Sequence, residues 1–249
     1  MTDLSVAERQ NLIREIGILK ELQRRHGQRL FYRLFPDEDV TGDDGEITYG
    51  RAKYPKHLEF FEAGAKYRER CFLAANRVGK SVAGAYETAC HLTGEYPDWW
   101  KGRRFPKPIR AWAAGKTNET TRDIVQTTLL GTTMQRDGRK TFTGTGVIPG
   151  HAVGSATWKQ GVTDLADTIK IRHVSGGWST LGLKSYQQGR GSFEGTAQHV
   201  IWPDEECPLD IYNECLIRTA TTNGLILHTF TPLDGLTEVV LHFLPQMGA

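Results

Sequence analysis

Apolar residues near the start of this chain recur at helical spacing. Leu12, Ile16 and Leu19 fall on one stripe of a helix that the pattern predicts from about Ser5 to Leu34. Arginines occupy much of the remaining surface of this helix. Such a distribution favours a solvated helix face over a phosphate-binding one.

Turn-forming and acidic residues follow this helix. The segment Pro36–Glu46 contains six acids and no base, which predicts an exposed loop. After Lys53 the pattern changes to short alternating apolar runs. We therefore divide the chain into an N-terminal helical lid segment with its acidic loop, residues 1–50, and a larger domain, residues 51–249.

The larger domain alternates predicted strands with predicted helices. Single strands are expected at 70–75, 109–114, 199–203 and 225–230, helices at 80–93, 118–130, 209–220 and 236–244, and a strand pair at 168–174 and 178–186. The first strand is expected to be buried, and the glycine-rich stretch 131–161 is expected to form loops or a mobile hairpin. This rhythm predicts an α/β fold with a mainly parallel central sheet flanked by helices on both faces.

Composition and charge exclude several classes of protein. The 249 residues are 39% hydrophobic and 24% charged, which is typical of a globular chain with one large domain. The net charge is +2, so any surface for a polyanion must be a local patch. The four cysteines and eight histidines lack metal-ligand spacing, so we expect free thiols and no transition metal. There is no signal-peptide pattern, and no apolar run reaches the roughly 18 residues of a membrane span.

The strongest chemical signal lies between the first predicted strand of the larger domain and the helix that follows. It resembles the phosphate-binding pattern G-x-x-x-x-G-K-[ST], in which backbone N–H groups surround phosphate oxygens. The predicted ATP-binding residues are Ala74, Ala75, Asn76, Arg77, Val78, Gly79, Lys80 and Ser81. Lys80 is expected to face the β- and γ-phosphates and Ser81 to ligate magnesium. Ala74 replaces the first glycine, which leaves open a degenerate loop in a non-hydrolysing nucleotide-binding module.

An acidic motif lies 124 residues after Lys80. The apolar run His199–Pro203 ends in Asp204, Glu205 and Glu206. An aspartate at the carboxyl end of a strand beside the loop strand can hold magnesium, and the next glutamate can orient or deprotonate the attacking water. We therefore predict Asp204 as a Mg²⁺ ligand and Glu205 as the catalytic base. The alternative is a solvated acidic turn, which a preceding apolar run disfavours.

A third candidate element is the strand 225–230 with its hydroxyl groups. Thr229 and Thr231 stand at its carboxyl end, where ligands gather in open α/β sheets, so either hydroxyl is a candidate for contact with the γ-phosphate or the attacking water. Threonine is also a common strand residue, and the following Pro-Leu-Asp-Gly is typical of a surface turn. Without the other two motifs, the sequence favours this structural interpretation.

The segment Trp99–Lys107 mixes aromatic residues with four basic ones. Such a mixture can meet a DNA backbone. The commoner arrangement buries the tryptophans and leaves the basic groups in solvent. We expect the second arrangement here.

Four segments together resemble the large terminase subunit of tailed double-stranded DNA bacteriophages, the ATPase that drives genome packaging. They read F-L-A-A-N-R-V-G-K-S, Y-P-D-W-W-K-G-R-R-F, G-R-G-S-F-E-G-T-A-Q-H-V-I-W-P-D-E-E and T-F-T-P-L-D-G, in the family's order. The resemblance covers most of the chain from about Tyr54 to Leu244. It implies a P-loop NTPase fold of the additional-strand, catalytic-glutamate type. It also implies Asp204 as the Walker B acid, Glu205 as the base, and Thr229 to Thr231 as the coupling motif.

The resemblance adds two catalytic arginines and an adenine-binding segment. Arg77 matches an arginine inside the phosphate loop, and Arg190, between two glycines, matches one that often precedes the Walker B strand. Arg77 is placed to reach its own nucleotide and Arg190 a neighbour's, although each also fits an ion-pair role. Tyr54 lies where the family often contacts adenine, but Glu59 replaces the glutamine expected there.

The resemblance implies a Mg²⁺-dependent ATPase that translocates double-stranded DNA into a procapsid in the cytoplasm of the infected host. Implied partners are the portal protein, the small terminase subunit and further copies in a ring. Family members carry their nuclease in a later domain, so we expect this chain to be an ATPase half without nuclease activity. A helicase-like ATPase that remodels nucleic acid without a capsid is the alternative enzyme.

Overall fold

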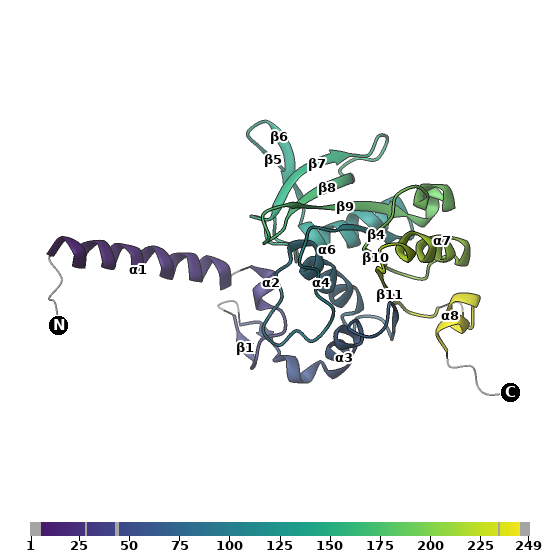
Figure 1. Cartoon of the computed structure of the whole chain (residues 1–249), viewed down its shortest axis with the longest axis horizontal. Helices are drawn as coiled ribbons and strands as arrows, with labels where there is room; N and C mark the ends of the chain where they lie inside the picture. The colour runs from purple at the N-terminus through teal and green to yellow at the C-terminus, as the bar shows by residue number, and fades with distance from the viewer. Residues whose placement is uncertain (1–5, 28, 43–44, 234, 245–249) are drawn as a thin grey trace. The chain divides into compact units, whose positions relative to one another are not determined.

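The computed structural model of the chain describes residues 6–27, 29–42, 45–233 and 235–244 (Figure 1). It divides into two compact units, Met1–Lys53 and Tyr54–Ala249. The first unit contains α1 (Val6–Gly27), α2 (Leu30–Arg33), β1 (Val40–Thr41), β2 (Ile47–Thr48) and the 3₁₀ turn η1 (Arg51–Lys53).

The helix predicted from about Ser5 to Leu34 is present in the first unit, but as two helices, α1 and α2. Leu12, Ile16 and Leu19 are exposed within this unit. The predicted acidic loop includes the short antiparallel pair of β1 and β2, and the Asp39 carboxylate accepts hydrogen bonds from Gly50 N (2.9 Å) and Lys53 Nζ (2.5 Å). Two acids of the loop, residues 43 and 44, lie outside the described residues.

The second unit is built on a seven-stranded sheet with the order β3-β11-β10-β4-β9-β8-β7. Its strands are β3 (Glu69–Leu73), β4 (Arg110–Gly115), β7 (Val153–Trp158), β8 (Ala166–Arg172), β9 (Trp178–Ser185), β10 (Val200–Pro203) and β11 (Leu225–Phe230). The five strands from β3 to β9 in this order pair in parallel, whereas β8 and β7 are antiparallel. The mainly parallel sheet and the β8–β9 strand pair are therefore confirmed.

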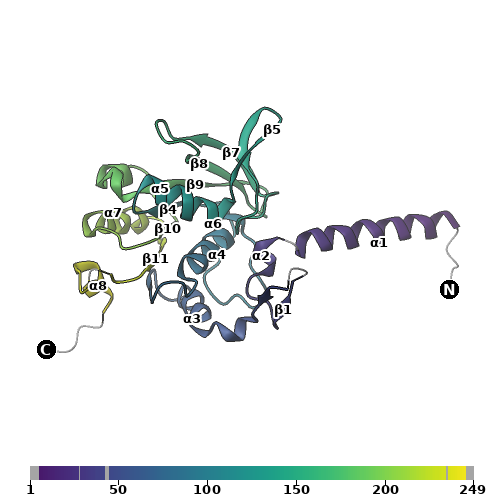
Figure 2. The ribbon, with the colours of Figure 1, turned by 180° about the vertical axis from the view of Figure 1, so that it is seen from behind.

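Helices cover both faces of this sheet, as predicted (Figure 2). They are α3 (Pro55–Ala63), α4 (Lys80–Thr93), α5 (Asn118–Thr120), the π-helical η2 (Thr121–Gln126), α6 (Thr127–Leu130), the 3₁₀ turns η3 (Tyr186–Gln188) and η4 (Arg190–Phe193), α7 (Leu209–Ala220) and α8 (Glu238–Phe243). On one face, α4 approaches β10 so closely that a Cβ on Gly84 would lie 2.2 Å from Trp202 Nε1. On the other face, α7 joins Trp112 and Ile201 in a buried apolar cluster.

One expectation about the strands is wrong, and another is incomplete. The first strand of the larger domain, β3, is an edge strand of the sheet, and Arg70 is its single buried residue, ion-paired with Glu87 on α4 (2.7 Å). The stretch 131–161 contains not only the hairpin of β5 (Thr133–Arg136) and β6 (Arg139–Phe142) but also β7. Local pattern does not reveal a strand's place in a sheet, and the glycines around β7 obscure its alternation.

The segment with mixed aromatic and basic residues folds largely as expected, although Trp99 and Arg103 are each half-buried. Trp100 is buried, its ring centroid lies 5.2 Å from that of Phe61, and its indole N–H donates to Arg103 O (3.0 Å). Lys101 and Lys107 remain exposed. All four cysteines are free thiols, which confirms that expectation. Within the described residues, none of the helices combines the length and apolar character that a bilayer span requires.

Candidate nucleotide-binding site

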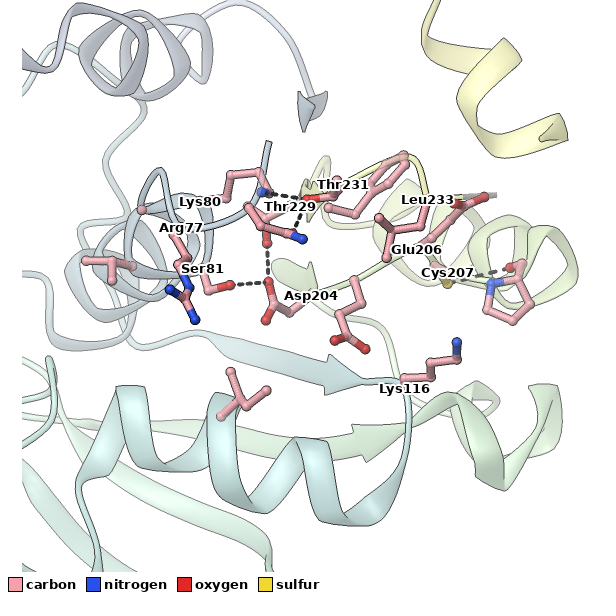
Figure 3. A pocket seen from close by; sticks show the side chains of 17 residues that line it. Arg77, Lys80, Ser81, Lys116, Asp204, Glu206, Cys207, Thr229, Thr231 and Leu233 are labelled. Atoms are coloured by element: carbon pink, nitrogen blue, oxygen red, sulfur yellow. Dashed lines mark hydrogen bonds between the residues drawn. The ribbon is translucent and has the colours of Figure 1, made fainter. Parts of the chain in front are cut away.

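The three predicted motifs meet in one pocket of about 770 Å³ at the carboxyl ends of the parallel strands (Figure 3). Its lining residues are Asn76, Arg77, Gly79, Lys80, Ser81, Val82, Lys116, Ile124, Asp204, Glu205, Glu206, Cys207, Pro208, Thr229, Phe230, Thr231 and Leu233. Strand β11 lies between β3, which leads into the loop, and β10, which leads into the acids. This order is that of a P-loop NTPase with the additional strand, so the predicted fold class is confirmed.

The loop between β3 and α4 has the backbone of a tight phosphate-binding turn. Its positive φ angles fall at Arg77 (+61°) and Gly79 (+84°), and Gly79 is the N-cap of α4. A Cβ on Gly79 would also lie 3.0 Å from His57 Nε2. Ala74 is not among the positive-φ residues, so the substitution of alanine for the first glycine imposes no backbone strain here.

Lys80 is the first residue of α4 and is buried. Its Nζ donates to Ala75 O (2.5 Å) and to Thr231 Oγ1 (2.8 Å). Burial lowers the pKa of Lys80, and the charge of Asp204 acts in the opposite direction. The ammonium group is therefore held at the base of the loop by neutral oxygens, where a phosphate would compensate its charge.

Asp204 is the buried carboxylate of the pocket, with 3% of its surface exposed. Its Oδ1 accepts hydrogen bonds from Ser81 Oγ (2.9 Å) and Thr229 Oγ1 (2.7 Å), and Trp202 Nε1 donates to Thr229 Oγ1 (2.8 Å). Burial raises the pKa of Asp204 to about 6, although both hydroxyl bonds oppose this rise. A carboxylate beside a serine hydroxyl offers the hard oxygen ligands that Mg²⁺ prefers, so the donor set fits this ion.

Glu205 follows with a left-handed backbone (φ +64°), which is uncommon for a residue with a side chain. Its N–H donates to Thr229 O (2.9 Å), and its carbonyl oxygen accepts from Tyr186 Oη (3.2 Å) and His228 Nε2 (3.0 Å). Tyr186 Oη also donates to Asp204 O (2.8 Å). These contacts fix the backbone of both acids while the Glu205 side chain lines the pocket.

The side chain of the neighbouring Glu206 is engaged with α8. Thr237, the N-cap residue of α8, donates its hydroxyl hydrogen to Glu206 Oε1 and accepts a hydrogen bond from Val240 N (3.3 Å). Glu206 thus anchors the start of α8. This engagement supports Glu205 over Glu206 as the reactive acid.

The candidate coupling residues both contact the nucleotide motifs. Thr229 bonds to Asp204, and the hydroxyl of Thr231 lies within hydrogen-bond reach of Asn76 Oδ1 (2.8 Å) and Ala74 O (2.9 Å). The carboxyl end of β11 is therefore tied to the loop and to the acidic motif at once. This geometry favours a role for both threonines at the site, and the coupling role stays a prediction.

The two candidate arginines have different surroundings. Arg77 is exposed and lines the pocket. Arg190, in η4, is not among the pocket-lining residues; its Nη2 lies 3.0 Å from Oε2 of the buried Glu214 on α7, and its Nε lies 3.8 Å from Glu194 Oε1. Within the described part of this chain, the structure brings Arg77 to the site and holds Arg190 in ion pairs.

Tyr54 is the N-cap residue of α3 and is not among the residues that line the pocket. Its ring packs edge-on against His57 (centroids 5.3 Å apart), the residue whose imidazole lies against Gly79. The adenine role of Tyr54 stays a prediction. Lys116 and Ile124 line the pocket but were not predicted; Lys116 directly follows β4, so the strand-end rule applied to every strand would have found it.

We expect acid to destabilise the second unit through His228. Burial lowers the pKa of His228 to about 4. Between pH 6.5 and pH 4 the unfolded chain binds a proton there that the folded chain does not, so the stability present above pH 6.5 is lost as the pH falls. The expected loss is about 3 kcal/mol. Chemical denaturation of wild type and His228→Gln across this range measures it; equal slopes for the two proteins would contradict the expectation.

Comparison with known proteins agrees with these observations. The family model described as terminase large subunit, T4likevirus-type, N-terminal, matches residues 71–248. The large terminase subunit of Salmonella phage P22 is 38% identical to this chain over 227 residues, in an alignment that covers 84% of this chain and 44% of the phage protein. The chain therefore spans less than half the length of that relative.

Two solved structures are similar at low sequence identity. The large terminase ATPase domain of Thermus phage P74-26 has a TM-score of 0.47 at 15% identity, covering 73% of this chain and 66% of that chain. The large terminase of another thermophilic bacteriophage, in complex with ADP, has a TM-score of 0.46 at 12% identity, covering 72% of this chain and 37% of that chain. The fold assignment rests on the strand order and the loop described above.

Proposed function

The chain belongs to the terminase large-subunit family, T4likevirus-type, matching its N-terminal part, and we propose that it hydrolyses ATP with Mg²⁺ to drive double-stranded DNA into a procapsid. One observation carries the proposal. A lysine and a serine hydroxyl from one segment, a buried aspartate and a glutamate from a second, and two threonines from a third converge in one pocket beside a phosphate-binding turn. A solvated acidic turn or a chance loop sequence does not account for that convergence.

The residues suit the separate tasks of phosphoryl transfer to water. The loop N–H groups and Lys80 would hold the β- and γ-phosphates, and Ser81 and Asp204 would hold Mg²⁺. The bound ion would neutralise charge on the phosphate oxygens. Glu205, with its backbone fixed, would orient the attacking water and accept its proton, while Arg77 lies in the same pocket as a further cation for the transferred phosphoryl group.

Phosphate release by this chain, measured with and without Mg²⁺ and with and without duplex DNA, tests the proposal. We expect release that requires Mg²⁺. ATP binding without release would favour a non-hydrolysing module. Separation of the strands of a forked duplex would favour the helicase-like alternative, because a packaging motor moves along intact duplex.

The partners and the compartment follow from the family and belong to this proposal. We propose double-stranded DNA, the portal protein of the procapsid, the small terminase subunit and further copies of the chain in a ring. The compartment is the cytoplasm of a phage-infected bacterium. Binding assays with the portal protein, and sizing of the chain with ATP, test the two protein contacts.

Arg190→Ala is expected to reduce ATP hydrolysis mainly in the assembled ring. The reason is that an arginine acting on the nucleotide of a neighbouring subunit has no target in an isolated subunit. The ion pair with Glu214 would then have to open in the ring. Mixing Arg190→Ala subunits with Lys80→Ala subunits, each of which lacks a different half of a shared site, should restore part of the activity. No recovery at any ratio, with assembly confirmed, would count against a role in trans.

We also expect this chain not to cleave DNA. Two-metal nuclease chemistry needs several carboxylates converging on ions about 3.5–4 Å apart. Across residues 6–27, 29–42, 45–233 and 235–244, no group of three or more His, Cys, Asp or Glu side chains could hold a metal ion. Supercoiled plasmid incubated with the chain and Mn²⁺ or Mg²⁺ should stay intact. Cleavage that disappears on changing Asp43 and Asp44, which lie outside the described residues, would contradict this expectation.

A further inference from the structure

The neighbouring strands β4, β9 and β8 lie side by side in the sheet (Figure 1) and carry basic side chains on one face. In the strand register, Lys170 pairs with Thr180 and Thr180 with Arg110, while Lys184 pairs with Ala114. Paired residues on neighbouring strands project from the same face, as do residues two apart along one strand. Arg110, Lys170, Arg172 and Lys184 therefore share one side of the sheet; we call them the basic face.

The opposite side of the same strands is the apolar core. Ile169 and Ile171 of β8 and Leu181 and Leu183 of β9 have no exposed surface. On the basic face, α7 packs over β10 and β11, at the far end of the sheet from β7. Arg110, Lys170 and Arg172 are exposed and Lys184 is half-buried.

These four cations lack acidic partners within the described residues. Several other basic side chains of this unit are paired with acids, as Lys56 is with Glu59 (2.8 Å) and Lys140 with Asp164 (2.5 Å). The sequences of β4 and β9 contain no acid, and β8 contains one, Asp167, at an irregularity of its pairing with β7. The charge of the basic face is therefore not neutralised locally.

Neutral contacts hold three of the four cations in place. Lys184 Nζ lies 5.2 Å from the ring centroid of Trp112, Arg172 Cζ lies 5.4 Å from that of Trp178, and Lys170 Nζ donates to Thr180 Oγ1 (2.8 Å). Cation–π and hydroxyl contacts orient a cation without cancelling its charge. Ordered, uncompensated cations on an exposed surface favour the binding of a polyanion, because their side chains lose less conformational freedom on binding than mobile side chains would.

We propose that the basic face binds the sugar-phosphate backbone of duplex DNA without regard to sequence. The choice of duplex DNA as the polyanion rests on the proposed function. Lys170 and Arg172, two residues apart on one strand, stand about 7 Å apart at their Cα atoms. Duplex DNA presents one negative charge per about 1.7 Å of its axis, so several phosphates fall within reach of a flat row of cations. Contacts to phosphates position a duplex but carry no sequence information.

The basic face is also connected to the nucleotide site through β9. Lys184 lies on the face, and Tyr186, two residues later, donates hydrogen bonds to the carbonyl oxygens of Asp204 (2.8 Å) and Glu205 (3.2 Å). A shift of the end of β9 on DNA binding would therefore reach both acids directly. We accordingly expect duplex DNA bound to the basic face to stimulate ATP hydrolysis through this strand.

The test compares this chain with the double variant Lys170→Gln, Arg172→Gln. Fluorescence anisotropy of a labelled duplex of random sequence, over a range of salt concentrations, gives affinity and salt dependence. Losing two phosphate contacts should lower the slope of log K against log salt by about 2 and weaken binding at least about tenfold at low salt. ATP hydrolysis without DNA should be unchanged, and the stimulation by DNA should be reduced.

The matched control removes two exposed lysines elsewhere, Lys101→Gln with Lys107→Gln, and should bind DNA like wild type. The exchange Lys170→Arg, Arg172→Lys keeps both charges and should restore binding, which separates lost charge from lost folding. If the Gln variant bound DNA as tightly as wild type, or if the control variant lost binding instead, the proposal for the basic face would be wrong and the proposed function would stand. Failure of the charge-conserving exchange to restore binding, or tighter binding of double-stranded RNA, would also overturn it. Wild type that fails to bind duplex DNA at low salt would overturn both.

Discussion

Lys80→Ala is expected to lower the rate of ATP hydrolysis at least about 100-fold, as removal of a single charge-stabilising group does in other active sites. The Lys80 ammonium sits at the start of α4, within hydrogen-bond distance of the loop at Ala75 O and of Thr231 Oγ1, which directly follows β11. Neither of the other pocket-lining cations occupies this position, because Arg77 projects from the exposed part of the loop and Lys116 follows a different strand. Phosphate release at saturating ATP measures the effect.

The stability of Lys80→Ala should differ little from that of wild type. Burial lowers the pKa of Lys80, so the charged side chain gains little from its site in the absence of a phosphate. Lys56→Ala, which removes an exposed lysine paired with Glu59, is the control and should hydrolyse ATP normally. A Lys80→Ala protein that unfolds at the wild-type temperature and still hydrolyses ATP at more than about a tenth of the wild-type rate would contradict the assignment of the loop.

Local signals in the sequence predicted those parts of the fold that local chemistry determines. The helix α4 begins and ends where predicted because Gly79 and Gly94, both with positive φ, bound it. The bounds of α7 and β11 were predicted for a similar reason, since each is a sharply periodic or continuously apolar run between turn residues. The three chemical motifs were predicted because each carries its residues within a few positions.

Contacts set by tertiary register were not predictable in the same way. The hydrogen bonds of Tyr186 and His228 to the Glu205 carbonyl depend on how β9 and β11 lie relative to β10, which no residue near Glu205 encodes. The edge position of β3 depends on strand order as well. The ion pair of Arg190 with Glu214 joins residues 24 apart, whereas the glycines on both sides of Arg190 suggested a freely projecting finger. The spacing of residues in the sequence identifies the candidate groups. The order and register of the strands in the sheet determine which of these groups come into contact.

Glu205→Gln is expected to bind ATP with wild-type affinity and to lose hydrolysis by at least about 100-fold. The amide keeps the shape of the side chain, and the backbone contacts of Glu205 to Thr229, Tyr186 and His228 do not involve the group that changes. Asp204 and Ser81 keep their contact (2.9 Å), so the oxygen ligands proposed for Mg²⁺ are retained. What is lost is the carboxylate that would accept the proton of the attacking water.

Glu206→Gln is the matched control, because it makes the same chemical change one residue later. Its side chain accepts a hydrogen bond from Thr237 at the start of α8, and a glutamine oxygen can accept that bond equally well. We therefore expect nearly wild-type hydrolysis from Glu206→Gln. Binding of a fluorescent ATP analogue and single-turnover phosphate release, measured on both variants, separate binding from chemistry. If Glu206→Gln were inactive and Glu205→Gln active, the base would be Glu206, and the left-handed turn at Glu205 would serve to aim its neighbour into the pocket.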